Sequence, residues 1–203
     1  MKSGVDEAAP AHLRTFDGRV LDLPAHRWFT AAGVAEQRAL DYAVGPALDV
    51  GCGPGRHLIA LAQRQVFALG IDISPLMLEI ARDRGVNVLK RSVFDRVPGE
   101  RRWRSALLLD GNIGIGGDPT ALLLRLRELL TGEGRVIVEL EPSDTGGRID
   151  LVRAETPAAV GPWFRWTTVG PRRLTAIARG VGYDVVDWWD AEARCFARLD
   201  VRA

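Results

Sequence analysis

Short blocks of apolar residues alternate along the chain with longer segments whose apolar residues recur every three or four positions. The blocks predict buried strands, and the longer segments predict helices that pack on a sheet. Strands are expected at residues 47–50, 66–71, 86–90, 104–109 and 135–140. Helices are expected at residues 31–42, 56–65, 74–84, 118–130 and 171–179. Because strands and helices alternate, the pattern predicts a doubly wound, mostly parallel sheet.

Two further apolar segments, residues 183–189 and 195–199, are separated by a link too short for a crossover. We therefore expect them to form an antiparallel pair. Trp188 and Trp189 should then point to opposite faces of their strand.

The composition is that of an ordinary globular chain. Of 203 residues, 47% are hydrophobic and 26% are charged, and the formal net charge of +1 gives no support to nucleic-acid binding. No apolar run is long enough to predict a membrane span, and the N-terminus lacks the apolar region of a signal peptide. Cys52 and Cys195 have no metal-ligand spacing, so we expect a cytoplasmic protein without a metal site.

A glycine-rich turn follows the first predicted strand in the segment LDVGCGPGRHL, residues 48–58. The glycines lie at positions 51, 53 and 55, whereas the dinucleotide-binding pattern places the third glycine one residue later. Asp72 ends the next strand, 21 positions after Gly51, where a carboxylate can accept the hydroxyls of a ribose. Asp49 stands directly before the turn. It would repel a pyrophosphate and attract an ammonium group, so the turn favours a zwitterion over a phosphate.

These residues resemble motif I of the class I, Rossmann-like S-adenosylmethionine-dependent methyltransferases. The segments LDVGCGPG, GIDIS, LLLDGN and LLTGEGRVIVELEP follow in the order of that family, over roughly residues 47–142. The resemblance implies an α/β fold with seven strands in the order 3-2-1-4-5-7-6, the last strand antiparallel and helices on both faces. It also implies methyl transfer from S-adenosylmethionine, with S-adenosylhomocysteine as product, to a small-molecule acceptor.

The resemblance further implies a division of the chain. Residues 1–15 would be a flexible tail and residues 16–203 a single domain. Within that domain, residues 16–45 would form an N-terminal lid and helix, and residues 46–142 the cofactor-binding core. Residues 143–203 would form an acceptor-side loop and the C-terminal strand pair.

The resemblance assigns a set of cofactor-binding positions along the carboxyl edge of the predicted sheet. These positions are Asp49, Gly51, Cys52, Gly53, Gly55, Asp72, Ile73, Ser92, Val93, Phe94, Asp110 and Gly111. Cys52 would contribute its backbone. Many family members have an aspartate where this chain has Ser92, so either Ser92 or Asp95 would meet the adenine.

The acceptor side is predicted from aromatic and polar residues expected at the same edge. Its candidates are Trp28, Asn112, Glu141, Trp163 and Trp166, with Glu139 beside Glu141 on the fifth strand. Transfer of an activated methyl group requires no particular catalytic side chain. His26 is the candidate general base, because it precedes the first helix, where this family often folds a lid.

Three other functions were weighed. An NAD-dependent oxidoreductase explains Asp72, but it fails on the glycine spacing and on Asp49, and the chain has no Tyr-x-x-x-Lys pair. A nucleic-acid methyltransferase would need a basic surface or an Asn/Asp-Pro-Pro-Tyr/Trp motif. A non-enzymatic S-adenosylmethionine-binding protein stays open on the sequence.

Overall fold

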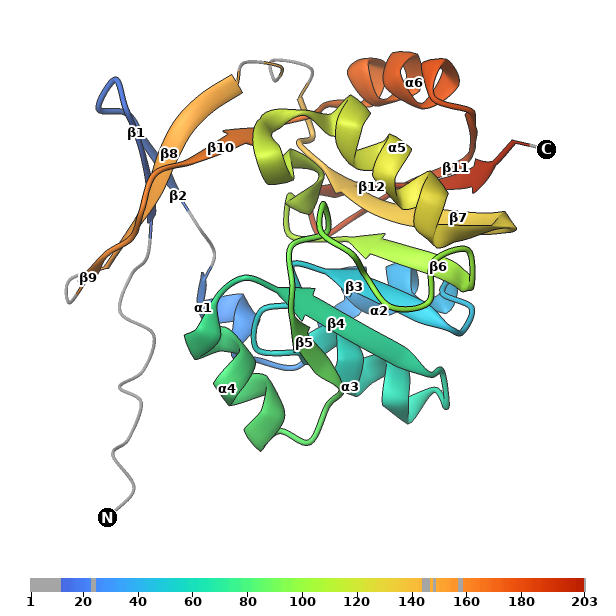
Figure 1. Cartoon of the computed structure of the whole chain (residues 1–203). Helices are drawn as coiled ribbons and strands as arrows, with labels where there is room; N and C mark the ends of the chain where they lie inside the picture. The colour runs from blue at the N-terminus through green and yellow to red at the C-terminus, as the bar shows by residue number, and fades with distance from the viewer. Residues whose placement is uncertain (1–11, 23–24, 144–146, 148, 157–158, 203) are drawn as a thin grey trace.

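The fold was analysed in a computed structural model, which describes residues 12–22, 25–143, 147, 149–156 and 159–202. A seven-stranded sheet lies at its centre (Figure 1). In spatial order its strands are β5 (Val88–Lys90), β4 (Ala68–Asp72), β3 (Ala47–Val50), β6 (Trp103–Leu108), β7 (Leu130–Leu140), β12 (Arg194–Val201) and β11 (Tyr183–Ala191).

The predicted strand order is confirmed. The strands from β5 to β7 are parallel to their neighbours, and β12 runs antiparallel to both β7 and β11. Trp188 and Trp189 lie on opposite faces as expected, with relative exposures of 40% and 5%. The strand β7 begins five residues earlier than predicted, because Leu130 pairs with Trp103 of β6 across a register shift.

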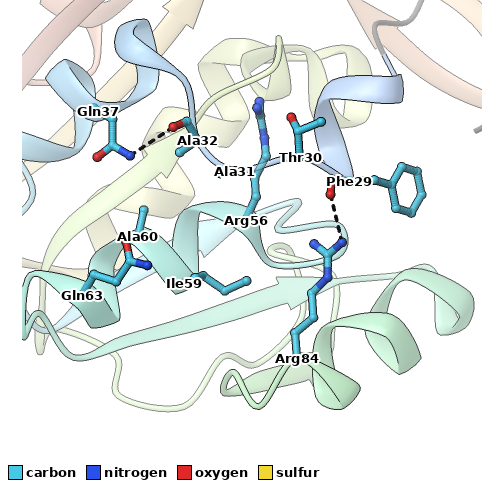
Figure 2. Close-up of a pocket in the computed structure, with 10 residues that line it drawn as sticks. All are labelled: Phe29, Thr30, Ala31, Ala32, Gln37, Arg56, Ile59, Ala60, Gln63 and Arg84. Carbon is cyan, nitrogen blue, oxygen red and sulfur yellow. Dashed lines mark hydrogen bonds between the residues drawn. The ribbon is translucent and has the colours of Figure 1, made fainter.

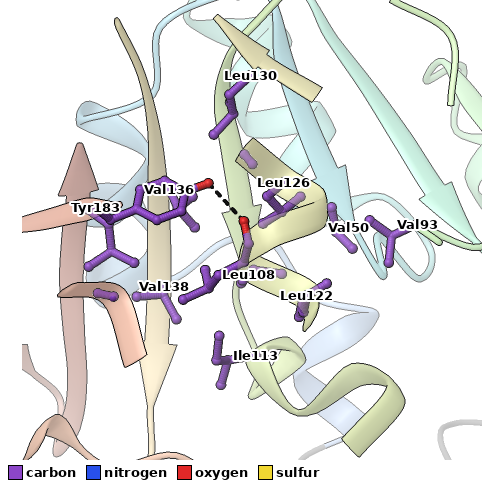
Figure 3. Packing of buried hydrophobic residues seen from close by; sticks show 14 of the residues in the cluster. Val50, Val93, Leu108, Ile113, Leu122, Leu126, Leu130, Val136, Val138 and Tyr183 are labelled. Carbon is purple, nitrogen blue, oxygen red and sulfur yellow. Dashed lines mark hydrogen bonds between the residues drawn. The ribbon is translucent and has the colours of Figure 1, made fainter. Parts of the chain in front are cut away.

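Helices cover both faces of this sheet. The helices α5 (Pro119–Leu129) and α6 (Pro171–Gly180) pack against one face, where Leu108, Val136 and Val138 meet Leu122 and Leu126 (Figure 3). The helices α2 (Val34–Asp41) and α3 (Arg56–Gln63) cover the other face, which also receives Leu78 of α4 (Pro75–Asp83). The buried Tyr183 hydroxyl donates a hydrogen bond to the Leu123 carbonyl at 3.1 Å, so this core contains a satisfied polar group.

Two helix starts follow from local chemistry. Ser74 and Asp118 precede Pro75 and Pro119, and their side chains accept hydrogen bonds from the backbone N–H groups of Met77 and Ala121. These are N-cap residues followed by a proline at the first helical position.

A second, antiparallel sheet was not predicted. Its strands lie in the order β10 (Phe164–Thr167), β8 (Ile149–Thr156), β1 (His12–Thr15) and β2 (Val20–Asp22), and β9 (Ala159–Val160) pairs with β8. It stands beside the carboxyl edge of the central sheet (Figure 1). The short helix α1 (Ala25–Trp28) and the 3₁₀ segment η1 (Asn112–Gly117) complete the elements.

Two predicted boundaries are therefore wrong. The last four residues of the predicted tail, 12–15, form β1, while residues 1–11 lie outside the described residues. The acceptor-side loop expected after residue 143 contains β8, β9 and β10. The physical reason is that the strands are short and that the pairing of β1 with β8 spans more than 130 positions, as in His12 with Glu155, so no local pattern reveals the sheet.

Candidate functional site

A cleft of about 710 Å³ opens at the carboxyl ends of β3, β4, β5 and β6 and is closed on its other side by the second sheet. This volume is in the usual range for small-molecule sites. Most of the predicted site residues line it. They are Trp28, Gly51, Cys52, Gly53, Asp72, Ile73, Ser92, Val93, Phe94, Asp110, Asn112 and Trp166.

The first two glycines of the turn shape the floor of this cleft. Gly51 has a φ of +73°, and a methyl group added there would lie 2.7 Å from Asn112 Nδ2. That nitrogen donates hydrogen bonds to the carbonyls of Val50 and Gly51, at 2.8 and 3.1 Å. Gly53 has a φ of +52° and open space where a Cβ would be. A ligand can therefore approach the backbone at Gly53.

The third glycine has a different role from the one predicted. Gly55 does not line the cleft. It is the N-cap of α3 with a φ of +84°, and an added methyl group would lie 2.7 Å from Val86 Cγ2. Gly55 therefore allows α3 to begin close to the neighbouring helix–strand connection, and the prediction that it binds the cofactor is not supported.

Asp72 is held in place at the end of β4. Its two carboxylate oxygens accept hydrogen bonds from the backbone N–H groups of Gly53 and Ser74, at 2.9 and 2.8 Å. A carboxylate has about four acceptor positions, so further donors can still be accommodated. Ile73 and Phe94, which are 67% and 44% exposed, present apolar surface to the cleft on either side.

In the loop after β5, Ser92 and Asp95 differ in their position relative to the cleft. Ser92 lines the cleft, and its hydroxyl accepts a hydrogen bond from the Phe94 N–H at 3.3 Å. Asp95 is exposed and does not line the cleft, and its carbonyl accepts a hydrogen bond from Arg125. Of the two residues, Ser92 is thus the one that lines the cleft.

The thiol of Cys52 lies away from the ligand space. A methyl group added at Gly70 would lie 2.6 Å from Cys52 Sγ, which places the thiol against β4. Burial raises the pKa of this thiol, and the charges of Asp49 and Asp72 raise it further. Cys52 is therefore an unreactive thiol, and its backbone is what the cleft uses.

Asp49 lies beneath the turn and not in the cleft, which corrects the prediction of a lining residue. It is 1% exposed, and it alternates with Leu48 and Val50 so that it points toward α3. Its Oδ2 lies 3.8 Å from His57 Nδ1 and has no hydrogen-bond partner among the described residues. The negative charge of Asp49 therefore lies beneath the glycine turn, on the side of α3, and is separated from the cleft by the turn itself.

A buried network of charged groups lies beside Asp110, where β6 ends. Arg56 binds the Asp110 carboxylate with Nη2 at 2.6 and 2.7 Å, and its Nη1 lies 3.0 Å from Glu36. Arg194 pairs with Glu36, and its Nε and Nη2 bind Glu139 at 2.7 and 2.6 Å. Three carboxylates against two guanidinium groups leave one net negative charge.

This network fixes Asp110 and lowers the pKa of Glu36. The Glu139 carboxylate accepts a hydrogen bond from the Asp110 N–H at 2.6 Å, and Asp110 is held at a φ of +55°. Burial alone would raise the pKa of Glu36. The hydrogen bond from Arg194 and the charges of Arg56 and Arg194 outweigh it and lower the pKa to about 2. Glu36 is therefore an anion at neutral pH.

The aromatic candidates for the acceptor side differ in whether they line the cleft. Trp28 and Trp166 line the cleft, and the Trp166 ring packs over Gly114 of η1. Trp163 does not line it. Its ring lies edge-on to Phe16, with 5.5 Å between centroids, and beneath the guanidinium of Arg153.

Four other predicted residues also lie outside the cleft. His26 and Glu141 are exposed, and neither lines it. Gly111 lies close to the Trp166 ring, and Glu139 is paired with Arg194. No residue predicted from the sequence is thus placed as a general base.

Several cleft residues lie outside the predicted set of site residues, although His57 was expected to be structural or near the cofactor and Phe164 to belong to an apolar pocket. Arg56 and His57 follow the glycine turn directly, and their position was the signal for a role in the site. Arg91 precedes Ser92, and Arg165 lies between Phe164 and Trp166 in the aromatic segment. The cleft also includes residues that only the second sheet brings there, namely Leu13, Ala154, Gly161, Pro162 and Phe164.

A smaller pocket of about 210 Å³ lies on the other side of Arg56 (Figure 2). Arg84 Nη2 donates to the Phe29 carbonyl at 3.2 Å, and Arg84 Nη1 donates to the Pro54 carbonyl at 3.2 Å. Gln37 Nε2 donates to the Ala32 carbonyl at 3.0 Å. These bonds tie the segment before α2 to the end of the glycine turn.

Two remaining observations concern other classes of protein. No helix in the described part of the chain is long and apolar enough to cross a membrane. Among the same residues, no group of three or more His, Cys, Asp or Glu side chains is placed to hold a metal ion.

The fold is Rossmann-like, and the comparisons find methyltransferases that are similar to this chain. A family model described as a methyltransferase domain matches residues 47–101, which contain the glycine turn and Asp72. A structure of an S-adenosylmethionine-dependent methyltransferase from Bacteroides fragilis, in complex with S-adenosylhomocysteine, superposes with a TM-score of 0.80 at 24% identity. That match covers 98% of this chain and 90% of the other. This likeness confirms the predicted Rossmann-like fold.

Particular relatives share shorter segments. A trans-aconitate 2-methyltransferase from Methylobacterium radiotolerans is 35% identical over 124 residues, which are 58% of this chain and 45% of the relative. A second trans-aconitate 2-methyltransferase, from Rhodococcus jostii, is 42% identical over 53 residues, which are 25% of this chain and 21% of the relative. The matches thus span about half or less of these curated relatives.

Proposed function

We propose that the chain binds S-adenosylmethionine in the part of the cleft formed by the central sheet, and transfers its methyl group to a small-molecule acceptor held against the second sheet. The observation that carries this proposal is the single cleft in which the open backbone at Gly53, the fixed carboxylate of Asp72 and the apolar surfaces of Ile73 and Phe94 meet.

The adenosine half of the cofactor fits these residues. The remaining acceptor positions of the Asp72 carboxylate suit the two hydroxyls of a ribose. Ile73 and Phe94 suit the faces of an adenine ring, and Ser92, which lines the same part of the cleft, would then lie at the ring edge. The backbone of Gly53 would pass beside the ribose and the methionine chain, where no side chain stands in the way.

The electrostatics of the cleft floor suit a cation. Asp49 is buried beneath the turn, and the network around Asp110 carries one net negative charge. The ammonium and sulfonium groups of S-adenosylmethionine are both positive, so a floor rich in carboxylates stabilises them. The product has lost the sulfonium charge, so the same floor favours its release relative to the substrate.

The chain would act chiefly by positioning. In the transfer, the bond between methyl carbon and sulfur breaks with its electron pair passing to sulfur, and a bond forms between the carbon and the acceptor nucleophile. Alignment of two bound reactants is worth up to about 7–11 kcal/mol. Because His26 is exposed and outside the cleft, we assign no general base.

Calorimetric titration with S-adenosylmethionine, S-adenosylhomocysteine and NAD tests the proposal. We expect saturable binding of the first two and none of NAD. An Asp72→Ala variant should bind about 10- to 100-fold more weakly, because it loses hydrogen bonds to a charged acceptor. Asp72→Asn, which keeps one acceptor oxygen, should be intermediate. Binding of NAD without binding of the other two would overturn the proposal.

A further inference from the structure

The two faces of the second sheet differ in chemistry. In an antiparallel sheet, residues opposite each other share a face, and successive residues of a strand alternate between the faces. The register places Leu13 opposite Ala154 and Phe164 opposite Val152. Leu13, Ala154 and Phe164 line the cleft, so their face, called here the inner face, is the one turned toward the cleft.

Most charged residues of this sheet lie on the opposite, outer face. By the register they are His12, Arg14, Arg153, Glu155 and Arg165. The Glu155 carboxylate pairs there with His12, Arg14 and Arg153, at 3.1, 2.7 and 2.7 Å. Arg165 borders the cleft between Phe164 and Trp166, but it stands opposite Leu151, so its side chain leaves from the outer face.

An acidic residue that shares the inner face does not line the cleft. Asp150 stands opposite Trp166, and its Oδ1 accepts a hydrogen bond from Arg19 Nη2 at 2.6 Å. Among the described residues, the inner face and the segment before β10 therefore contribute only apolar or aromatic side chains to the cleft. These residues are Leu13, Ala154, Gly161, Pro162, Phe164 and Trp166. Trp28 of α1 and Ile115 of η1 extend the apolar lining.

The charged residues that line the cleft belong to its other wall, which the central sheet forms. They are Arg56, His57, Asp72, Arg91 and Asp110. Because the proposed cofactor occupies this wall, a charged group of an acceptor held against the inner face would lose its water without gaining a partner. An anion would also be repelled by Asp72 and Asp110, and a cation by the sulfonium of the cofactor.

We propose that the acceptor is an uncharged molecule with a flat, largely apolar body, which lies against the inner face at Phe164 and Trp166. The inference rests on the proposed function, because a cofactor on the central-sheet wall is what leaves the inner face to the acceptor. The alternation of side chains in β1, β8 and β10 then excludes carboxylates and phosphates, since it turns the cations of these strands away from the cleft.

Three probes with the same naphthalene body test the charge of the acceptor. They are the neutral naphthalene-2-carboxamide, the anion naphthalene-2-carboxylate and the cation 2-naphthylmethylammonium. Each is added to protein saturated with S-adenosylmethionine, and binding is read from the rise in melting temperature with probe concentration. The amide should bind, and both charged probes should bind about tenfold or more weakly. A charged probe that binds as tightly as the amide, or an amide that does not bind, would overturn the proposal.

Neighbouring residues on opposite faces provide a matched pair of variants. Phe164→Ala removes a ring from the inner face and should weaken amide binding about tenfold. Arg165→Ala changes the outer face and should leave the binding of all three probes unchanged. Equal losses of amide binding in the two variants would contradict the assignment of the faces.

A third variant should gain binding, which a misfolded protein cannot do. Ala154→Arg places a cation on the inner face and should tighten carboxylate binding about 10- to 100-fold. Unchanged carboxylate binding in this variant would mean that the probes do not lie against the inner face, and the proposal would fail. If S-adenosylmethionine itself produced no rise in melting temperature, the proposed function would be the part that fails.

Discussion

The two sheets that enclose the cleft are built by different means. The central sheet is held by buried apolar side chains from consecutive strand–helix units, such as Leu108, Val136 and Leu122. The second sheet joins segments from opposite ends of the chain and carries ion pairs such as Arg14 with Glu155 and Arg19 with Asp150. The second sheet should therefore open at a lower free energy than the central sheet.

The largest effect should come from the buried charge network at the edge of the central sheet. Replacing Arg194 by Met leaves Glu139 without its cation and Glu36 with Arg56 alone, and should lower the free energy of unfolding by about 3–5 kcal/mol. Arg19→Met in the second sheet removes a half-exposed pair and should cost below about 1 kcal/mol. Urea unfolding measures both, and equal losses would contradict the distinction.

Alanine substitutions at two glycines of the turn should affect ligand binding and protein stability to different extents. Gly53→Ala places a methyl group in the open cleft and should weaken S-adenosylmethionine binding about tenfold or more, with a stability loss of about 1–2 kcal/mol from its positive φ. Gly55→Ala drives a methyl group against Val86 and should reduce stability by about 1–3 kcal/mol beyond that strain. Calorimetry measures the loss of binding, and thermal melts measure the loss of stability. If Gly55→Ala weakened binding more than Gly53→Ala did, Gly55 would contact the cofactor.

Acid should weaken the fold through Glu36. Its pKa is about 2 in the folded chain and near 4.5 otherwise, so the unfolded chain binds more protons at intermediate pH. The stabilisation is complete above the unfolded pKa and is lost as the pH falls from about 5 toward 2. A Glu36→Gln variant should be less stable at pH 7 and show a shallower loss below pH 5. An unchanged slope in that variant would place the acid sensitivity elsewhere.

The smallest effect should be a salt dependence confined to the second sheet. The hydrogen bond from Arg14, together with those from Arg153 and His12, lowers the pKa of Glu155 to about 2, so this cluster is charged at neutral pH. Salt screens such partly exposed pairs. Hydrogen exchange at β1 and β8 should quicken on addition of salt, while β3 and β6 are unaffected. A matching response in β3 and β6 would mean that the two sheets open together.

The same difference explains what the sequence could predict. Each strand of the central sheet lies next to its helix in the sequence, so the periodicity, the caps at Ser74 and Asp118 and the glycine turn predict the fold and most of the cleft residues that the central sheet contributes. The second sheet depends on pairings such as Leu13 with Ala154, which leave no local pattern. Aromatic residues marked its segment, but the sequence could not tell that Trp166 faces the cleft and Trp163 faces Phe16.

The charge network shows a second kind of limit. Its members Glu36, Arg56 and Arg194 lie on three separate elements, α2, α3 and β12. From the sequence alone, each would be expected at the surface of its element. Only the packing of the three elements removes these side chains from water. Once buried, each charge needs a partner of opposite sign.

Hydrogen exchange with and without ligands tests the central claim most directly. S-adenosylhomocysteine should slow exchange at residues 51–53, 72–74 and 92–94 and leave exchange at residues 12–15, 152–155 and 164–167 close to that of the free protein. Protection of the second sheet by S-adenosylhomocysteine, with none at the glycine turn, would contradict the assignment of the two walls.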